Sequence, residues 1–320
     1  MPTALILRAL GLGDFVTGLP AMRLLRQALP RHRLILAAPA VFQPLLELGV
    51  PADELLPTGE LAPIDTGPIG TGQPIEVAVD LHGNGPASRR LLHELRPSRV
   101  VGFGHPASGL PGPPWWAAEH EITRWERLVA QGFGLDPAAV TGQPGRLAVP
   151  AEPVPRQVTV LHPGAAANSR RWPVERFAAV ADRLSRQGHR VVLTGSPAEQ
   201  PLLAQLGRAT GARPLTGLSL RQLFGLVAGA RLVVCGDTGI AHVASLYRTP
   251  SVVLFGPVAP ERWGPPASGP HRVLWHGDGT GDPHGDEPDP ALLRITVPQV
   301  LAAIAQLEEH DSDRQRVGGL

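Results

Sequence analysis

The sequence predicts an α/β protein that is divided into two parallel-sheet domains, and three observations support this fold class. Strand-like apolar runs alternate with amphipathic helical stretches almost from end to end, which is typical of parallel α/β architecture. The length of 320 residues exceeds the usual size of one hydrophobic core. A proline-dense connector at residues 136–156 separates two halves of similar pattern. We expect Rossmann-like domains at 1–150 and 151–295, a closing helix at 296–310 and a disordered tail at 311–320.

In the first half, apolar runs predict the strands and helical spacing predicts the helices. The expected strands lie at 3–9, 33–39, 53–58, 75–83 and 96–105, and the expected helices at 15–29, 41–48 and 119–133. Residues 59–74 contain too much glycine and proline for regular structure, and residues 106–116 are expected to form a loop.

The second half repeats this alternation. The expected strands lie at 157–164, 190–197, 231–237 and 250–257, and the expected helices at 174–188, 198–210, 219–230 and 240–247. In the first of these helices, four apolar residues fall on one face: Phe177, Val180, Ala181 and Leu184. The acidic, glycine-rich segment 277–290 is expected to be a mobile, solvated loop.

Composition argues against several classes of partner and site. The net charge is +1, and no basic run is interleaved with aromatic residues, so nucleic acid is not an expected partner and at most peripheral membrane contact is expected. Cys235 is the single cysteine, which excludes an internal disulfide and a cysteine-based zinc site. The first apolar segment is short and is interrupted by Arg8, unlike a signal peptide, so we expect a cytoplasmic protein.

Ligands in open parallel α/β sheets bind beyond the carboxyl ends of the strands, so the turns that follow strands are the candidate sites. Four such turns stand out by their glycines and polar residues. They are "LGLGDF" (10–15), "HPGAAANSRRWP" (162–173), "TGSPAEQ" (194–200) and "CGDTGIAHVAS" (235–245).

The first turn contains Gly-x-Gly, but Val16 stands where a dinucleotide-binding turn needs its third small residue. The acidic Asp14 would also repel a pyrophosphate, which argues against an NAD site. Two interpretations of Asp14 stay open at this point. It caps the following helix, as aspartate commonly does, or it is a catalytic carboxylate.

The last turn starts a helix whose first backbone N–H groups, at Thr238 and Gly239, favour an anion such as a diphosphate. The alternative is that Asp237 is a simple helix cap. In the second turn, Arg170 or Arg171 has the charge and the forked geometry to bind a phosphate.

Taken in this order and spacing, the turns resemble glycosyltransferase family 9, the ADP-heptose:lipopolysaccharide heptosyltransferase family. The segments that carry the resemblance are "LILRALGLGDFVTGLPAMRLLR", "HPGAAANSRRWPVERFAAVADRL" and "VVCGDTGIAHVASLYRTPSVVLFGP". The resemblance implies a GT-B fold, in which two Rossmann-like domains face each other across a cleft. It also implies metal-independent, inverting sugar transfer from a nucleotide-diphosphate donor, with ADP-heptose as the co-substrate and no other cofactor.

The resemblance also implies roles for individual residues. Asp14 matches the general base that takes a proton from the acceptor hydroxyl. Arg170 stands where the family usually has a lysine that contacts the donor phosphate, which keeps the charge and changes the geometry. Glu199 matches the acidic residue that holds the ribose hydroxyls. The remaining candidates are Asp237, Thr238, Gly239 and His242 for the diphosphate and sugar, and Gly13 and Gly164 as phosphate-contacting or turn glycines.

The acceptor is expected to touch the first domain, where His82, Asn84 and Arg89 are candidates, although they also suit simple capping and loop roles. The acceptor is expected to be a glycan or a small-molecule hydroxyl. No spacing of metal ligands is seen in the sequence. Two alternatives to a glycosyltransferase stay open: a sugar-nucleotide 2-epimerase of the same fold, and a non-catalytic protein that binds nucleotide sugars.

Overall fold

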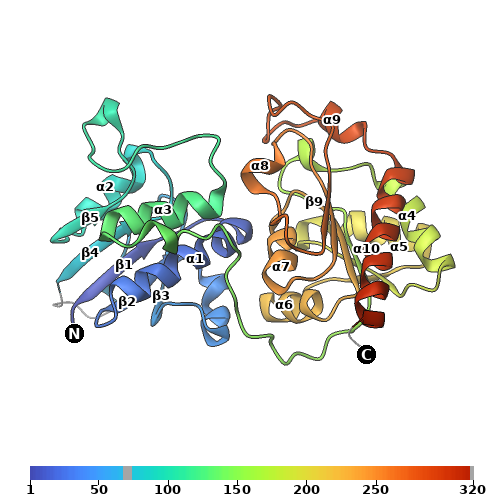
Figure 1. The fold of residues 1–320 in the computed structure, drawn as a ribbon, viewed down its shortest axis with the longest axis horizontal. Helices are drawn as coiled ribbons and strands as arrows, with labels where there is room; N and C mark the ends of the chain where they lie inside the picture. Colours follow the sequence, from blue (N-terminus) through green and yellow to red (C-terminus); the bar gives the residue numbers. More distant parts are fainter. Residues whose placement is uncertain (68–73, 318–320) are drawn as a thin grey trace. The chain divides into compact units, whose positions relative to one another are not determined.

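The computed structural model describes residues 1–67 and 74–317, and the chain divides into two units, Met1–Ala148 and Val149–Leu320. The division falls two residues before the expected domain boundary. Each unit is a parallel β-sheet with helices packed on it (Figure 1), so the expected pattern of two Rossmann-like domains is confirmed. Part of the expected irregular segment 59–74 lies outside the described residues.

The first unit is built on a five-stranded parallel sheet in the order β3-β2-β1-β4-β5. The strands alternate with helices because each apolar run is followed by an amphipathic stretch. The strands are β1 (Thr3–Leu7), β2 (Arg33–Ala38), β3 (Glu54–Pro57), β4 (Ile75–Asp80) and β5 (Arg99–Val101), and the helices are α1 (Leu12–Ala28), α2 (Pro86–Glu94) and α3 (Glu121–Phe133). The central strand β1 is fully buried, and α1 and α3 lie side by side (Figure 1).

The second unit holds a six-stranded parallel sheet in the order β11-β10-β9-β6-β7-β8. Its strands are β6 (Thr159–His162), β7 (Val191–Thr194), β8 (Arg213–Leu215), β9 (Leu232–Gly236), β10 (Ser251–Leu254) and β11 (His271–Leu274). Its helices are α4 (Val174–Arg186), α5 (Gln200–Thr210), α6 (Leu220–Ala228), α7 (Gly239–Tyr247), α8 (Pro260–Trp263), α9 (Pro290–Leu293) and α10 (Val297–Val317). The four predicted apolar positions of α4 are all buried in a core shared with α5, α10 and the sheet.

Several details differ from the sequence-based expectations. Residues 41–48, expected as a helix, belong to a 3-10 helix at Ala40–Leu48 that contains Pro44. Strand β11 was not predicted. It is a short edge strand of four residues, and those beyond His271 are only partly buried. Helix α10 extends beyond the expected end at residue 310, and residues 318–320 lie outside the described part of the chain.

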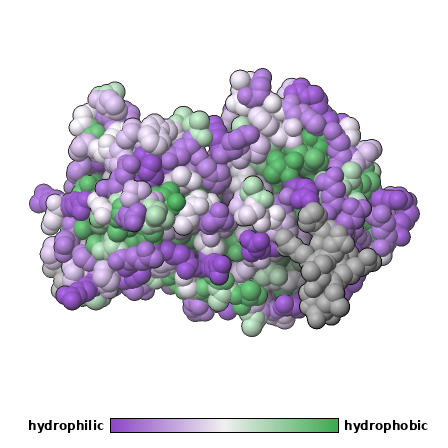
Figure 2. Space-filling model, viewed as in Figure 1, coloured by the Kyte–Doolittle hydropathy of each residue, from purple (hydrophilic) through white to green (hydrophobic). Residues whose placement is uncertain are grey.

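The surface follows from the same patterning of apolar and polar residues. In the face drawn in Figure 2, hydrophilic residues cover much of both units, and hydrophobic residues show as separate, small areas. Within residues 1–67 and 74–317, no helix combines the length and the apolar character that a membrane span requires.

Candidate functional site

Asp14 lies in the first turn of α1, directly beyond the carboxyl end of β1. The N-cap of α1 is Gly11, and no side-chain capping bond is made there, so of the two open interpretations of Asp14 the helix cap is wrong. Gly13 lies inside the helix, where its carbonyl accepts a hydrogen bond from the Thr17 hydroxyl at 3.0 Å. With 30% of its side chain exposed, Asp14 presents a carboxylate that a ligand can reach.

A fully buried arginine backs this carboxylate. Arg8 follows β1, and its Nη2 lies 3.7 Å from Asp14 Oδ1, while its Nε donates to the Asp14 carbonyl at 2.9 Å. The guanidinium also donates to the Leu81 carbonyl and, at 3.2 Å, to Thr17 Oγ1. Arg8 therefore holds the first turn of α1 in place through the Asp14 carbonyl and the Thr17 hydroxyl.

Glu121, the first residue of α3, brings a second carboxylate to the same guanidinium. Its Oε1 lies 3.4 Å from Arg8 Nη2 and accepts a hydrogen bond from Trp125 Nε1 at 2.6 Å. Its Oε2 pairs with Arg124, and the Trp125 ring lies 4.7 Å from Arg8 Cζ. Two arginines, Arg8 and Arg124, and two carboxylates, Asp14 and Glu121, thus form one cluster of balanced charge. The sequence analysis did not identify Arg8 or Glu121 as part of the site.

Burial raises the pKa of Asp14 above its usual value, because it disfavours the charged form. Arg8 opposes this effect, whereas the charge of Glu121 adds to it, and His82 lowers the pKa slightly. A carboxylate whose pKa is raised is a stronger base than an ordinary aspartate, which suits proton abstraction.

The expected acceptor residues lie beyond the carboxyl end of β4, around a buried carboxylate that the sequence analysis missed. Asp80 accepts hydrogen bonds from the His82 backbone N–H at 3.1 Å and from Ser88 Oγ at 2.8 Å. Burial raises the pKa of Asp80 and lowers that of His82. Asn84 lies half-buried in the same loop. His82 and Asn84 therefore stay candidates for acceptor contact.

Arg89 has a structural role instead. It is buried, donates to the Phe103 carbonyl at 2.7 Å and lies 3.7 Å from Asp80 Oδ2. A Cβ at Gly102 would overlap the guanidinium, so the backbone packs directly against it. These contacts argue against the expected contact between Arg89 and an acceptor.

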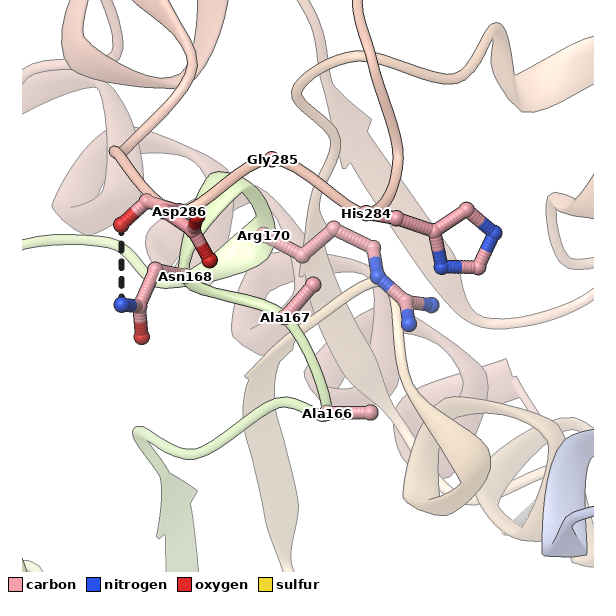
Figure 3. A pocket seen from close by; sticks show the side chains of 7 residues that line it. All are labelled: Ala166, Ala167, Asn168, Arg170, His284, Gly285 and Asp286. Carbon is pink, nitrogen blue, oxygen red and sulfur yellow. Dashed lines mark hydrogen bonds between the residues drawn. The ribbon is translucent and has the colours of Figure 1, made fainter.

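In the second unit, Arg170 lines a cavity of about 300 Å³. Figure 3 shows its side chain extending past Ala167 toward the His284 ring, with Asn168 at the other end of the cavity. Within the described residues, the guanidinium makes one long hydrogen bond, from Nη1 to the Asp237 carbonyl at 3.4 Å, and its buried Nε has no partner. An arginine with unused donors at a cavity is suited to bind an anion.

The other wall of this cavity comes from the acidic segment 277–290, through His284, Gly285 and Asp286. The sequence predicts a mobile loop here, and in the structure hydrogen bonds connect this stretch to the loop after β6. Ser169 N donates to the Gly285 carbonyl at 3.0 Å, and Asn168 Nδ2 donates to the Asp286 carbonyl at 2.8 Å. The sequence analysis missed His284 and Asp286 because a composition rich in Gly, Asp and Pro resembles that of a solvated loop.

The turn after β9 places its predicted residues next to Arg170. Asp237 is buried, and burial raises the pKa of its carboxyl to about 6 although Arg170 lowers it. Thr238 is the N-cap of α7 without a side-chain capping bond, and Gly239 is the first helical residue. Ala241 N donates to the Thr238 carbonyl at 2.9 Å, and the N–H groups of Thr238 and Gly239 precede the hydrogen-bonded ladder of the helix. His242 is buried, and its ring centroid lies 5.8 Å from that of Trp263.

Glu199 lies in the turn after β7, as predicted, but part of its carboxylate is used within the protein. Oε2 accepts hydrogen bonds from Ser196 N at 2.7 Å and from Ser196 Oγ at 2.9 Å. Oε1 lies 4.0 Å from Arg171 Nη2, and a Cβ at Gly164 would overlap this carboxylate. Gly164 is thus required for close packing, and Oε1 is the oxygen left for a ligand.

Arg171, the alternative phosphate ligand, is engaged in its own loop. Its Nε donates to the Ala165 carbonyl at 2.9 Å and its Nη1 to Asn168 Oδ1 at 2.8 Å. Of the two adjacent arginines, Arg170 is therefore the better candidate for contact with a ligand. Across residues 1–67 and 74–317, no group of three His, Cys, Asp or Glu residues is placed to hold a metal ion.

The family model and the curated relatives point to one family. The model of "Glycosyltransferase family 9 (heptosyltransferase)" matches residues 114–280. The chain is 37% identical over 113 residues to "Lipopolysaccharide heptosyltransferase 2" of Salmonella typhimurium, which covers 33% of this chain and 32% of the relative. It is 31% identical over 153 residues to "Lipopolysaccharide heptosyltransferase 1" of Pseudomonas aeruginosa, covering 46% of this chain and 42% of the relative. These two matches span 32% and 42% of the relatives' length.

Solved structures extend the likeness in fold over nearly the whole chain. The "ADP-heptose lps heptosyltransferase II" of E. coli matches with a TM-score of 0.79 and 21% identity, covering 97% of this chain and 99% of that one. A family 9 glycosyltransferase from Veillonella parvula matches with a TM-score of 0.79 and 19% identity, covering 96% and 97%. The expected GT-B fold class is thereby confirmed. The family match covers more than half of the sequence, and the chain belongs to glycosyltransferase family 9, the heptosyltransferase family.

Proposed function

We propose that this chain is a glycosyltransferase that moves a sugar from a nucleotide-diphosphate donor to a hydroxyl group, with inversion at the anomeric carbon. The observation that carries the proposal is the Asp14 carboxylate, which is partly exposed in the first turn of α1 and has a raised pKa. A second element of support is the Arg170 cavity, with its unused guanidinium donors beside the N-terminus of α7.

In the proposed reaction, Asp14 accepts the proton of the acceptor hydroxyl. The acceptor oxygen attacks the anomeric carbon from the face opposite the leaving group, and the bond from that carbon to the diphosphate oxygen breaks. Removing the proton as the new bond forms avoids a positively charged acceptor oxygen, which is the benefit that a general base provides.

The departing diphosphate gains negative charge, so the donor side must supply compensating positive charge. Arg170 supplies a full charge, and the N–H groups of Thr238 and Gly239 add the positive end of the α7 dipole. We propose that these groups stabilise the leaving group without a metal ion. Glu199 Oε1 is proposed to accept a hydrogen bond from a ribose hydroxyl, and His242 to contact the donor sugar.

The donor is proposed to be an ADP-linked heptose. The support comes from a structural relative, because one E. coli heptosyltransferase of this fold has been solved "with ADP" and with "ADP-2-deoxy-2-fluoro heptose". The acceptor is proposed to be a glycan or a small-molecule hydroxyl. The curated relatives are named for lipopolysaccharide or lipooligosaccharide. The first test is therefore a thermal-shift panel of ADP, UDP, GDP and dTDP, in which ADP alone is expected to stabilise the chain.

The decisive experiment compares Asp14→Asn with the native chain, using ADP-heptose as donor and oligosaccharide fragments of lipopolysaccharide as acceptor. Asparagine keeps the shape and cannot take the proton, so we expect transfer to fall by about 10²–10⁴-fold while ADP binding is unchanged. Asp136→Asn is the matched control, because it neutralises an exposed aspartate of the same unit, where asparagine can replace it as a helix cap. Native transfer by Asp14→Asn would refute the proposed base.

A further inference from the structure

The neighbours of Asp14 present an electrostatic problem. Arg8 lies against Asp14 and is completely buried, so its charge is poorly screened by water. A cation at this distance stabilises the ionised carboxylate and weakens it as a base. If Arg8 were the only partner of Asp14, it would hold the carboxylate in place but would also lower its proton affinity.

Glu121 changes this balance because it binds the same nitrogen of the same guanidinium. Arg8 Nη2 lies 3.4 Å from Glu121 Oε1 and 3.7 Å from Asp14 Oδ1, so Glu121 is the closer of the two carboxylates. The Glu121 side chain is 5% exposed, whereas that of Asp14 is 30% exposed. The buried carboxylate thus faces the arginine, and the partly exposed one faces outward.

The position of Glu121 is itself fixed by several contacts. Trp125 Nε1 donates to Oε1 at 2.6 Å, and Arg124 pairs with Oε2. Both partners lie on α3, one turn along from Glu121, and His120 Nδ1 caps this helix by accepting from Ile122 N at 3.2 Å. The beginning of α3 therefore holds Glu121 against Arg8 in one geometry.

We propose that Glu121 is a positioning residue for the base: acting through Arg8, it fixes the Asp14 carboxylate and offsets the positive charge that Arg8 places beside it. The inference rests on the proposed role of Asp14. The groups that face Asp14 are Arg8 after β1, Glu121 from α3 and His82 after β4. Of these three, Glu121 is the acid that increases the proton affinity of Asp14.

The test measures the titration of Asp14 directly in the whole chain, without substrate, by carbon-13 NMR of aspartate carboxyl groups, and the resonance is assigned with Asp14→Asn. Glu121→Gln keeps the shape of the side chain and removes its charge, so Arg8 then acts on Asp14 alone. We expect the titration midpoint of Asp14 to fall by roughly one pH unit.

Glu126→Gln is the matched control. It removes the same charge from a buried position on the same helix, where Glu126 binds Thr141 and Gly142 instead of Arg8. We expect it to leave the Asp14 midpoint unchanged. If Glu121→Gln does not fold, Arg124→Gln serves as the second variant. It removes the competing cation from Glu121, and the midpoint of Asp14 is then expected to rise.

A folded Glu121→Gln or Arg124→Gln chain with the native Asp14 midpoint would overturn the inference. So would an equal shift in Glu126→Gln, because the effect would then be one of overall charge. This failure is distinct from failure of the proposed function. If Asp14→Asn transfers sugar normally, Asp14 is not the base, whatever its titration shows.

Discussion

Each unit places an arginine beyond its first strand, Arg8 after β1 and Arg170 in the loop after β6, and their surroundings differ. Arg8 is fully buried, donates hydrogen bonds to four groups of the protein and lies next to two carboxylates. Arg170 is partly buried, lines a cavity, and within the described residues donates one long hydrogen bond. The guanidinium is satisfied by protein groups at Arg8 and keeps unused donors at Arg170.

The two arginines indicate what each unit contributes to the proposed reaction. A general base must be held in one geometry before the substrate arrives, so its supporting charges are paired in advance. A site for an anion must instead keep positive charge that the protein has not neutralised. We therefore expect substitutions at Arg8 to act on folding and substitutions at Arg170 to act on binding.

The largest effect is expected for Arg8→Gln. It leaves Glu121 and Asp14 without their shared cation, and the loss of one partner of a buried ion pair costs about 3–5 kcal/mol. Hydrogen exchange read by mass spectrometry is expected to rise across β1, α1 and α3 and to stay native in the second unit. The control is Arg26→Gln, whose arginine pairs with the exposed Asp53 and is expected to contribute less than about 1 kcal/mol. Equal protection in both variants would show that the Arg8 cluster is not structural.

The second prediction concerns the pH dependence of stability at Asp237. Burial raises the folded-state pKa to about 6, above the value of about 3.9 for an unfolded chain. Between these two values the folded protein binds the proton more tightly, so the free energy of unfolding falls as the pH rises through this window. By pH 8 the loss amounts to about 3 kcal/mol at most.

Asp237→Asn removes this titration. We expect the variant to match the native chain at pH 4 and to be more stable at pH 8, as measured by urea unfolding at both values. Asp136→Asn, at an exposed carboxylate, is expected to differ from the native chain by the same amount at both pH values. A gain for Asp237→Asn that does not depend on pH would contradict the buried ionisation. The predicted gain also indicates that the carboxylate is kept at a cost in stability, as is common at functional sites.

Much of this architecture was predictable because its causes are local. The alternation of apolar strands and amphipathic helices fixes the two parallel sheets, and parallel sheets bring the ends of neighbouring strands together. Asp14, Arg170 and Asp237 could therefore be placed beyond strand ends from the sequence alone.

The partners of these residues were not predictable, because they come from distant parts of the chain. Glu121 meets Arg8 across 113 residues, and Asn168 bonds to Asp286 across 118. No periodicity or motif relates such positions. Glu121 and Arg124 do share the i, i+3 spacing of a helical ion pair, but this spacing is equally common on exposed helix faces. The pair of Glu121 and Arg124 is buried because α3 packs beside α1.

The smallest effect is expected for the pair Arg170 and Arg171, whose roles the sequence left open. Arg170→Gln removes a guanidinium whose buried Nε has no partner in the described residues, so we expect stability to change by less than about 1 kcal/mol. Loss of a charged hydrogen bond to phosphate is expected to weaken ADP binding by roughly tenfold to thirtyfold, measured by calorimetry.

Arg171→Gln is the matched comparison, because the donors of Arg171 are already used by Ala165 and Asn168. It is expected to weaken ADP binding by no more than about threefold. The reverse order of affinities would assign the phosphate to Arg171 and would remove the contrast between Arg8 and Arg170.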